Sequence, residues 1–537
     1  MIQPTLKLSL LSRPSREKLH SQTQDPRLPP DMLLEIAQCL AEPRNILRFC
    51  LTSSSIFALL LPALYASVDY KGPKRCTERL EFLLRRPELA HYIQKLVLRP
   101  SHLLAASQST IEVELSITRA LELLAPNLHS LRTFIWDGLE MPEDHIWATL
   151  RMSCPRLKYV GSSIGERPIP TESELFNFNN LVGFSLISKW QARADPLLPW
   201  DDILYETLPD NLWKMLLDRS AQLQELVLGG ENQSIYNRLF DVRQLTRGYW
   251  PRLHSLILGR TMMQDVNSWD LDTPHRDLTD DFNHFLHSHP TLKRLDLPYP
   301  SRYPKIDLTD SNVRLESFSG SLPYLFDILG NCKLKSLRLC TEQHPSWYIP
   351  YVRRVLSELH CLTSLDIWID LSHPTEEFES EDGFDNPESR EKDHIKVFRS
   401  ILVSCHSLLH FKVKCSTRTK HGFLMKDFWK ALKDGPRLKT LQVFKVYALG
   451  EENMMQSALN MAHHLPSIEQ ITLQYSINSW STYVRPKLKQ TGTYDFIKSE
   501  TGELIRMVAG EHGSGFFRPF SRFYECKPRR KYSKYVK

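Results

Sequence analysis

Residues 334–339 read LKSLRL and residues 362–367 read LTSLDI, so both follow the pattern apolar-x-x-apolar-x-apolar. The second half of this pattern alternates apolar and polar residues, which is typical of a short strand with one buried face. The pattern recurs between residues 93 and 473 at intervals of 19 to 46 residues. The other copies are IQKLVL (93–98), LRTFIW (131–136), LVGFSL (181–186), LQELVL (223–228), LHSLIL (253–258), LKRLDL (292–297), LLHFKV (408–413), LKTLQV (438–443), IEQITL (468–473) and the weaker LKYVGS (157–162) and LESFSG (315–320).

A stretch with helical periodicity often precedes a copy of the pattern. Examples are DNLWKMLLDRS (210–220), DDFNHFLHSHP (280–290), VRRVLSELH (352–360), VFRSILVSCHS (397–407) and KDFWKALKDGP (426–436). One helix and one strand cannot enclose their own apolar side, whereas stacked units share a continuous core. The sequence therefore predicts an α/β solenoid over residues 71–475, with parallel strands on the concave face and helices on the convex face. An ordinary α/β domain with Leu-rich strands is the alternative.

The repeated pattern resembles the leucine-rich repeat family, with two departures. The Asn or Cys that the family carries after the last apolar position is replaced here by Glu231, Thr261, Glu342 and Asp370. Several intervals also exceed the usual 20–29 residues. We therefore expect an irregular arc with loop insertions. The largest insertion, 372–393, is acidic and poor in apolar residues, and we expect a mobile loop there; a docking site for a basic partner is the alternative.

The pattern stops after residue 475, and residues 476–537 are expected to form a C-terminal cap and a basic tail. Within the cap, YDFIKSETGELIRMV (494–508) predicts a hairpin with its turn at Thr501 and Gly502. The tail KPRRKYSKYVK (527–537) is basic and is expected to be solvated. At the other end, residues 1–25 carry several basic residues and few acidic ones, and a disordered arm is expected there.

The amino-acid composition argues against several classes of function. The 537 residues include 68 Lys and Arg and 62 Asp and Glu, for a formal charge of +6, which is too mild to indicate nucleic-acid binding. Only 20 residues are Gly, so Gly-rich phosphate loops are disfavoured. The ten cysteines form no CxxC pair, which is typical of reduced thiols in the cytoplasm or nucleus. The longest apolar run, 56–68, is too short to span a bilayer. We expect no cofactor, no metal, no nucleic acid and no membrane partner.

Residues 28–70 differ from the repeats and read LPPDMLLEIAQCLAEPRNILRFCLTSSSIFALLLPALYASVDY. Pro30 and Asp31 suit the first turn of a helix, and the step from Glu42 to Pro43 should end it. Asn45 is placed to cap a second helix, which Pro62 should end. Three short helices cannot bury so many large apolar side chains among themselves, because domains of this size are marginally stable. Part of this apolar surface should contact another protein; an N-terminal cap of the solenoid is the alternative.

This block resembles an F-box, whose pattern runs Leu-Pro-x-Glu-Leu-Leu-x-x-Ile-x-x-x-Leu before a gap and a Leu-rich helix with Ser and Phe. The first half matches in register at Leu28, Pro29, Leu33, Ile36 and Leu40, with Asp31 and Met32 as mild replacements. The second half fits through Leu47, Leu51, Ser53 and Phe57. The ending LLLPALYASVDY resembles the close of fungal F-box motifs. We assign the resemblance to residues 26–70, and the order of F-box and then leucine-rich repeats is similar to that of many fungal proteins.

The resemblance implies a function without catalytic residues. An F-box docks on a Skp-type adaptor carried by a cullin, and the repeats hold a protein substrate for ubiquitination in an SCF-type ligase. A repeat scaffold that binds proteins without a role in ubiquitination is the alternative function. The adaptor-binding residues implied here are Leu28, Pro29, Met32, Leu33, Ile36, Leu40, Leu47, Leu51, Phe57, Leu61 and Tyr65.

The unidentified protein substrate is expected on the concave face of the solenoid. The polar x positions of the strands point to that face, which solenoids use for binding. Arg and Trp dominate measured interface hot spots. The candidate residues are Arg294, Asp296, Arg338, Asp366, Trp368, His410, Lys412 and Lys414.

Two further patterns are weak. Residues 161–165 read GSSIG and match GxSxG, but a nucleophile elbow needs a helix directly after Ser163, and ERPIPTES follows instead. A hydrolase that depends on Ser163 is therefore a third option only. His284, His287 and His289 lie close together in the sequence, yet neither Cys nor carboxylate completes a familiar metal site. We expect these histidines to cap a helix.

Overall fold

The structure is a computed structural model of the whole chain. The residues it describes are 28–40, 43–101, 108–165, 167–189, 205–230, 239–259, 261–263, 279–297, 306–308, 311–329, 333–345, 349–371, 387–416, 423–432, 437–446, 453–476, 489–498 and 504–514. The predicted N-terminal arm (1–25) and the basic tail therefore lie outside the described residues. The acidic insertion is described only from residue 387 onward.

The described residues form one large sheet of 16 strands in sequence order, and β6, β8 and β10 form a separate small sheet. Neighbouring strands from β1 to β17 are parallel, whereas β17, β18 and β19 pair antiparallel. Their bounds are β1 Ser67–Lys71, β2 Lys95–Arg99, β3 Thr133–Trp136, β4 Tyr159–Ile164, β5 Gly183–Ser188, β7 Glu225–Gly230, β9 Ser255–Leu258, β11 Arg294–Leu297, β12 Ser317–Gly320, β13 Ser336–Pro345, β14 Ser364–Asp370, β15 His410–Ser416, β16 Thr440–Val446, β17 Gln470–Ser476, β18 Lys489–Lys498 and β19 Leu504–Ser514.

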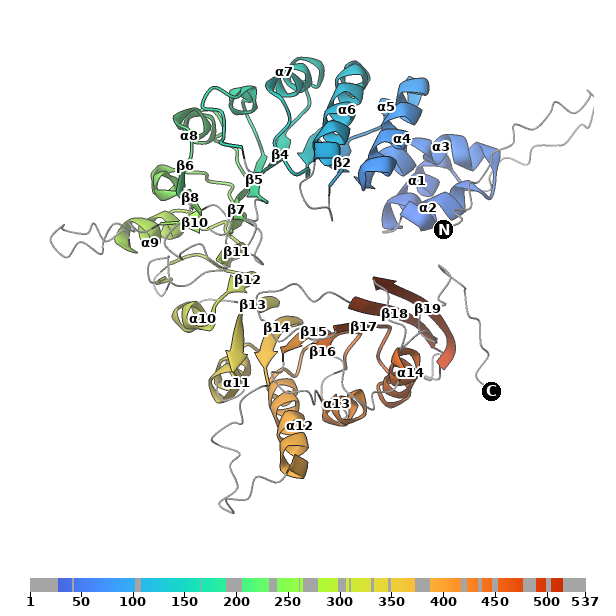
Figure 1. Cartoon of the computed structure of the whole chain (residues 1–537), viewed down its shortest axis with the longest axis vertical. Helices are drawn as coiled ribbons and strands as arrows, with labels where there is room; N and C mark the ends of the chain where they lie inside the picture. The colour runs from blue at the N-terminus through green and yellow to red at the C-terminus, as the bar shows by residue number, and fades with distance from the viewer. Residues whose placement is uncertain are drawn as a thin grey trace, which may run out of the picture.

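The helices form a second layer outside the sheet. Figure 1 shows an open arc, with the strands along its inner rim, the helices along its outer rim, and the first helices facing the C-terminal hairpin. The helices are α1 Pro30–Cys39, α2 Pro43–Cys50, α3 Ser54–Tyr65, α4 Pro73–Arg85, α5 Pro87–Ala90, α6 Gln108–Leu124, α7 Asp144–Ser153, α8 Asp210–Leu217, α9 Thr279–His287, α10 Leu322–Ile328, α11 Ile349–Glu358, α12 Pro387–Ser404, α13 Met425–Leu432 and α14 Met454–His464, with short 3₁₀ turns η1 Ala125–Asn127, η2 Glu174–Asn177 and η3 Arg243–Arg247.

The core lies between the two layers and is continuous from Cys76 to Phe496. Each strand buries alternate residues: in β16, Leu441 and Val443 face the helices, whereas Thr440 and Gln442 face the concave side and stay partly exposed. This alternation is the period of two that the repeated pattern carries. Because each repeat covers the apolar side of the next one, no single repeat needs a core of its own.

The mixed α/β architecture with a large parallel sheet confirms the prediction from the repeated pattern. Every copy of the pattern forms a strand, and each strand begins two residues after the start of its copy. The five predicted helical stretches correspond to α8, α9, α11, α12 and α13. The hairpin also forms, although its strands β18 and β19 extend beyond the predicted range 494–508.

Several details differ from the prediction. Residues 67–71 form β1, paired with β2, so the sheet begins inside the range 26–70 that we assigned to the F-box resemblance. The small sheet of β6 (Tyr205–Thr207), β8 (Leu239–Asp241) and β10 (Thr261–Met262) was not predicted, because these strands are too short to show a period. Residues 387–393 of the predicted loop begin α12. Pro387 suits the first position of that helix, and charged helix formers follow it.

Pro62 also behaves differently from the prediction. The second helix ends at Cys50 rather than at Pro62, and Pro62 lies inside α3. Ser53 starts α3, since its hydroxyl accepts a hydrogen bond from the amide of Ser55 at 3.3 Å. An N-cap Ser of this kind satisfies an amide that the helix leaves unpaired, so the chain breaks at the cap rather than at the proline.

Candidate functional site

The helical block, residues 28–65, has only a small core of its own. Leu33, Ala37, Cys50 and Leu60 are its buried apolar residues, and partly buried neighbours such as Leu34 and Ile56 pack against the last three. Ala37 and Cys50 are small, so little apolar area leaves water inside the block. The free energy of burial scales with that area, and the block therefore gains little from it.

The same block leaves large apolar side chains in solvent. They lie on all three helices: Leu28, Met32 and Ile36 at and along α1, Leu47 on α2 with Leu51 just after it, and Phe57 on α3. Met32 is 49% exposed and Leu51 is 75% exposed. Because Met32 and Ile36 are four residues apart, they lie on one side of α1, and Leu28 precedes the helix. We call these six residues the apolar docking face.

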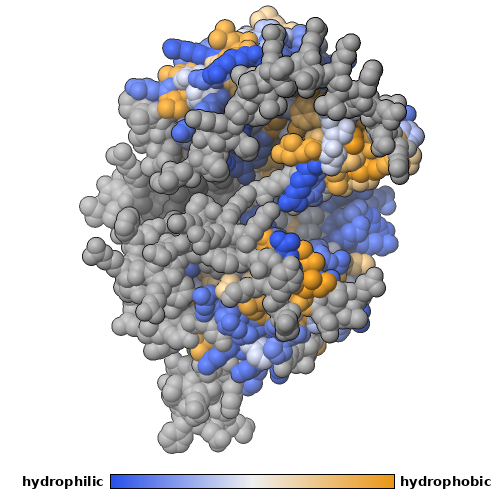
Figure 2. Space-filling view, turned by 90° about the vertical axis from the view of Figure 1, so that its right-hand side faces the viewer, coloured by the Kyte–Doolittle hydropathy of each residue, from blue (hydrophilic) through white to orange (hydrophobic). Residues whose placement is uncertain are grey.

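This exposure is concentrated rather than spread over the molecule. In the described part of the chain, 15 large apolar side chains are exposed, and six of them belong to the apolar docking face within residues 28–57. The other nine are scattered over the outer helices and the C-terminal hairpin. Figure 2 faces the side of the arc on which both of its ends lie, and it shows apolar surface at the upper right as well as smaller patches at the upper left and in the lower half. Concentrated apolar surface marks an interaction site, whereas single exposed apolar residues are ordinary.

The remaining residues that the F-box resemblance singled out are not equally exposed. Pro29 is exposed, Leu40 is half-buried, and Leu33 is buried within the block. Leu61 and Tyr65 pack against the core of the solenoid. Burial raises the pKa of the Tyr65 hydroxyl. These last two side chains are partly buried and help to fix the block to the arc.

The joint between the block and the arc is formed by backbone as well as side chains. The carbonyl of Ala66, directly after α3, accepts hydrogen bonds from the amides of Gln94 and Lys95 at 2.9 Å. One side of the block is thus closed by the first repeat, while the apolar docking face stays open. The N-terminal cap that we considered as an alternative accounts for the closed side only.

Strand register places the predicted substrate residues in adjacent rows on the concave face. Arg338, Asp366 and Lys412 are direct neighbours on β13, β14 and β15. Lys412 Nζ donates to Asp366 Oδ2 at 2.6 Å, and Arg338 Nε lies 3.7 Å from the same oxygen. Asp366 is therefore shared by two cations. Each of these ion pairs contributes little to stability at a partly exposed site. What they provide is a fixed position for the three charged groups.

In the next row, an aromatic ring and a cation meet. Trp368 on β14 is paired with Lys414 on β15, and Lys414 Nζ lies 3.3 Å from the centre of the indole ring. The indole Nε1 of Trp368 is buried and has no acceptor in the part of the chain that the structure describes. A buried donor without an acceptor carries a desolvation cost, which a bound acceptor removes.

Three predicted residues stand apart from this group. Arg294 and His410 are exposed, and His410 Nδ1 lies 2.9 Å from Thr440 Oγ1. Asp296, predicted to be exposed on β11, is only 5% exposed. Burial raises the pKa of its carboxyl group, and its Oδ1 has no hydrogen-bond partner among the described residues. The strand pattern shows which face a residue occupies, and it does not show how deeply that face is covered.

Sequence reasoning missed a second charged cluster on the sheet near the N-terminal end of the arc. Arg99 Nε, at the end of β2, donates to Asp69 Oδ1 at 3.1 Å, and Arg99 also pairs with Asp137. Lys189 pairs with the other carboxylate oxygen of Asp137. Part of the signal was present, since Arg99 ends β2, Asp137 directly follows β3 and Lys189 directly follows β5, whereas Asp69 lies in the middle of β1. Parallel strands bring such ends together.

The two weak patterns do not form sites. Ser163 lies inside β4, is buried, and donates to the carbonyl of Gly138 at 2.7 Å, so no strand-to-helix elbow presents it. His289 accepts a hydrogen bond from the amide of Trp250 at 2.9 Å, and His287 lies 2.7 Å from the carbonyl of Asp307. These histidines join repeats to one another. No cluster of metal-binding side chains occurs among the described residues.

Nothing in the described chain has the length and apolar character of a membrane-crossing helix. No protein-family description matches this chain, and no curated protein matches it. Among solved structures, a chain from the crystal structure of the Rad7 and Elc1 complex in yeast matches with 13% identity and a TM-score of 0.37, over 78% of this chain and 93% of that one. A chain from the TLR13–ssRNA13 complex matches with 14% identity and a TM-score of 0.20, over 67% and 56%. TM-scores this low identify no close relative.

Proposed function

We propose that the helical block is an F-box that docks a Skp-type adaptor, and that the solenoid holds a protein substrate for an SCF-type ubiquitin ligase. The observation that carries the proposal is the apolar docking face, which is open on α1, α2 and α3 around a very small core. A partner that covered Met32, Ile36 and Leu51 would remove from water the area that the block cannot bury itself. Full burial of each such side chain contributes about 1.5–3 kcal/mol.

In this role the chain acts by position rather than by chemistry. The adaptor end fixes the chain to the ligase, and the concave end fixes the substrate. Holding a substrate near the transferring enzyme raises its effective concentration without any new reacting group. The fixed joint at Ala66, Leu61 and Tyr65 supports this role, because a rigid joint sets the direction in which the substrate is presented.

The concave rows on β13–β15 are the proposed substrate site. Arg338, Asp366 and Lys412 offer charges in a fixed order, and Trp368 offers a half-buried aromatic ring. A protein segment that crosses these strands would meet side chains about 4.8 Å apart from one strand to the next. Charges at fixed spacing select a substrate mainly because a segment with the wrong order of charges would place like charges next to each other.

Charged substitutions in the apolar docking face test the adaptor role. Met32→Glu and Leu51→Glu should abolish co-purification of the Skp-type adaptor with the full-length chain, because each places a carboxylate in a dry interface. Met152→Glu and Leu123→Glu are matched controls, since Met152 is 73% exposed and Leu123 is 67% exposed on other helices. Adaptor binding that survives the first pair of changes, or that is lost equally with the second pair, contradicts the proposal.

Turnover of a bound substrate separates the ligase from the scaffold without a ubiquitin role. Proteins captured by the wild-type chain and identified by mass spectrometry are followed in cells that carry Met32→Glu. The ligase function predicts that a captured substrate still binds but is degraded more slowly. An unchanged half-life of every captured protein supports the scaffold instead.

A further inference from the structure

Helix α4, the first helix after the block, exposes two neighbouring stripes of side chains that differ in how their charges are paired. In the first stripe, Lys74 Nζ lies 3.8 Å from Glu78 Oε1, and Arg85 Nη2 donates to Glu81 Oε2 at 3.2 Å. Both pairs are spaced by four residues, as ion pairs along a helix are. The first stripe is therefore neutral.

The second stripe is unbalanced. Arg75, Arg79 and Phe82 are exposed at spacings of four and three residues, and exposed Arg86 caps the helix four residues later. Arg86 pairs with Glu88 at 3.3 Å, but Arg75 and Arg79 form no ion pair with any described residue. The stripe thus presents unpaired guanidinium groups beside an aromatic ring that is 37% exposed.

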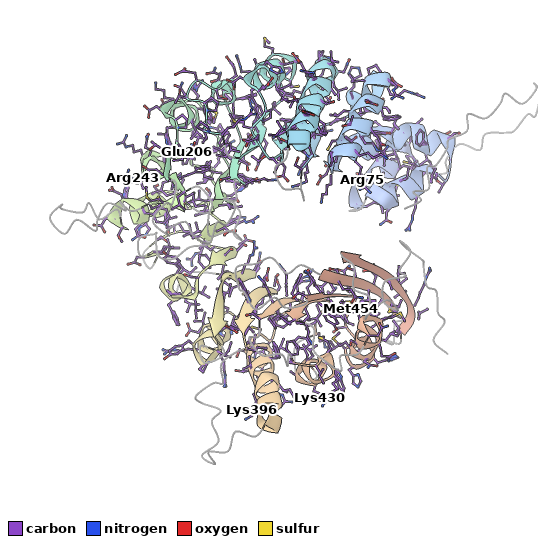
Figure 3. The ribbon with its side chains drawn as sticks, in the orientation of Figure 1. Arg75, Glu206, Arg243, Lys396, Lys430 and Met454 are labelled. Carbon is purple, nitrogen blue, oxygen red and sulfur yellow. The ribbon has the colours of Figure 1, made fainter. Side chains whose placement is uncertain are left out.

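Local helix energetics do not account for Arg75. It lies in the first turn of α4, and that turn contains no acidic residue. A cation at a helix N-terminus opposes the helix dipole, and Lys74 in the same turn is at least compensated by Glu78. Figure 3 labels Arg75 on α4, at the end of the arc that carries α1–α3. A residue that breaks a local rule without a local gain indicates a role in function.

The stripe borders the helical block. The positive charges of Arg79 and Arg86 act on the Tyr65 hydroxyl and oppose the rise in its pKa that burial causes. Tyr65 is the last residue of α3, the helix that carries Phe57 of the apolar docking face. Phe57 lies in the first turn of α3 and Tyr65 at its end, so a partner that extends from the apolar docking face along α3 reaches α4.

We propose that the adaptor-docking surface continues onto α4, where Arg75 and Arg79 bind carboxylates of an acidic segment of the adaptor and Phe82 packs against an apolar side chain of it. This inference rests on the proposed function of the helical block. An Arg guanidinium binds a carboxylate through two parallel hydrogen bonds, and Arg and aromatic residues are enriched at interfaces. A nucleic-acid backbone fits less well, because it needs a longer row of cations than the neutral first stripe permits.

A pair of matched double variants of the full-length chain tests this inference, with purified Skp-type adaptor as the probe. Arg75→Gln with Arg79→Gln and Lys74→Gln with Arg85→Gln each remove two positive charges from α4. The first pair should weaken adaptor binding about tenfold, mainly through a slower association rate, whereas the second should change it less than about twofold. The difference should shrink at about 0.5 M salt, because screening shortens the reach of exposed charges.

Variants that retain the positive charges provide a second test. Arg75→Lys with Arg79→Lys should restore most of the association rate but not the full affinity, since Lys lacks the planar fork of Arg. Circular dichroism and the melting temperature confirm that each variant folds. Equal adaptor affinity for the two Gln pairs overturns the inference while the proposed function stands, provided that Met32→Glu abolishes binding. A wild-type chain that does not bind the adaptor overturns both.

Discussion

The helical block and the solenoid are joined in one chain, yet they bury their apolar residues in opposite ways. In the solenoid, each strand of the repeated pattern places its apolar residues in a core that runs from Cys76 to Phe496. In the block, the three helices bury Leu33, Ala37, Cys50 and Leu60 and leave six large apolar side chains exposed. A repeat is completed by the next repeat along the chain, whereas the last helices at the end of an array have no neighbour on one side.

Under the proposed function, the difference marks where the partner binds. The open face of the block cannot be explained as a mere end of the array, because Leu61, Tyr65 and Ala66 already join the block to the first repeat. The C-terminal end of the sheet is closed in another way, by the antiparallel hairpin of β18 and β19. One end of the arc is thus covered by its own chain, whereas the apolar docking face is exposed in the described part of the chain, and the proposed function assigns that face to a second protein.

Removing a core aromatic residue from the solenoid should have the largest effect on stability. Trp250 is fully buried, and its indole Nε1 donates to the carbonyl of Leu216 at 3.0 Å. Trp250→Ala should lower the free energy of unfolding by about 3–5 kcal/mol. The adjacent Tyr249 is 65% exposed, and Tyr249→Ala should change the free energy of unfolding by less than about 0.5 kcal/mol. Chemical denaturation measures both, and similar losses would contradict a core confined between the two layers.

Stability of the solenoid should also depend on pH through His289. Burial lowers the pKa of its imidazole below the ordinary value of 6.5, and Nε2 accepts the amide hydrogen of Trp250. The unfolded chain therefore binds the proton more readily, so stability present above pH 6.5 is lost as the pH falls below it. The melting temperature should fall between pH 7 and pH 5. His289→Gln should reduce this fall, and an unchanged fall in that variant would count against the assignment.

Asp296 should show the opposite dependence on pH. Burial raises the pKa of its carboxyl group above the ordinary value of 3.8, so the folded chain binds the proton more readily. Its contribution to stability is therefore lost as the pH rises through the folded pKa. Asp296→Asn should raise the melting temperature more at pH 7 than at pH 4. Exposed Asp495→Asn is the control, and an equal response of the two variants would show that Asp296 is not desolvated.

The smallest effect on stability is expected in the apolar docking face. Met32→Ala and Leu51→Ala should change the free energy of unfolding by less than about 0.5 kcal/mol, because both side chains are exposed in the free chain. Addition of the Skp-type adaptor should raise the melting temperature of the wild type and much less that of the double variant, since a ligand stabilises only the state it binds. A large loss of stability without the adaptor would mean that the face is already covered.

The fold could be predicted from sequence to the extent that its parts repeat. The alternation of apolar and polar residues predicted thirteen strands and the face of the sheet on which each of their residues lies. It could do so because alternation is visible in a short stretch of sequence. The breaks inside the helical block were harder. Ser53 and Pro62 both favour a break, and the hydrogen bond that the Ser53 hydroxyl accepts from the amide of Ser55 decides between them. The three short strands of the second sheet carry no period at all.

The candidate sites show the same limit. The apolar docking face followed from a pattern in one stretch of sequence, and Leu28, Met32 and Leu51 are indeed exposed. Leu61 and Tyr65 belong to the same pattern but face the solenoid, because packing against a later part of the chain is invisible in a short motif. The unpaired stripe on α4 was also missed, since only a structure shows that Lys74 and Arg85 have partners and Arg75 has none among the described residues.

Hydrogen exchange of the full-length chain, with and without purified Skp-type adaptor, tests most directly whether a second protein completes the helical block. Amides of α1 and α2 should exchange much faster than those of β14–β17 in the free chain, because local opening exposes little buried area there. The adaptor should slow exchange in α1, α2 and the first half of α3 and leave β14–β17 unchanged. Helices that are already as protected as the solenoid, and that do not respond to the adaptor, would contradict the account.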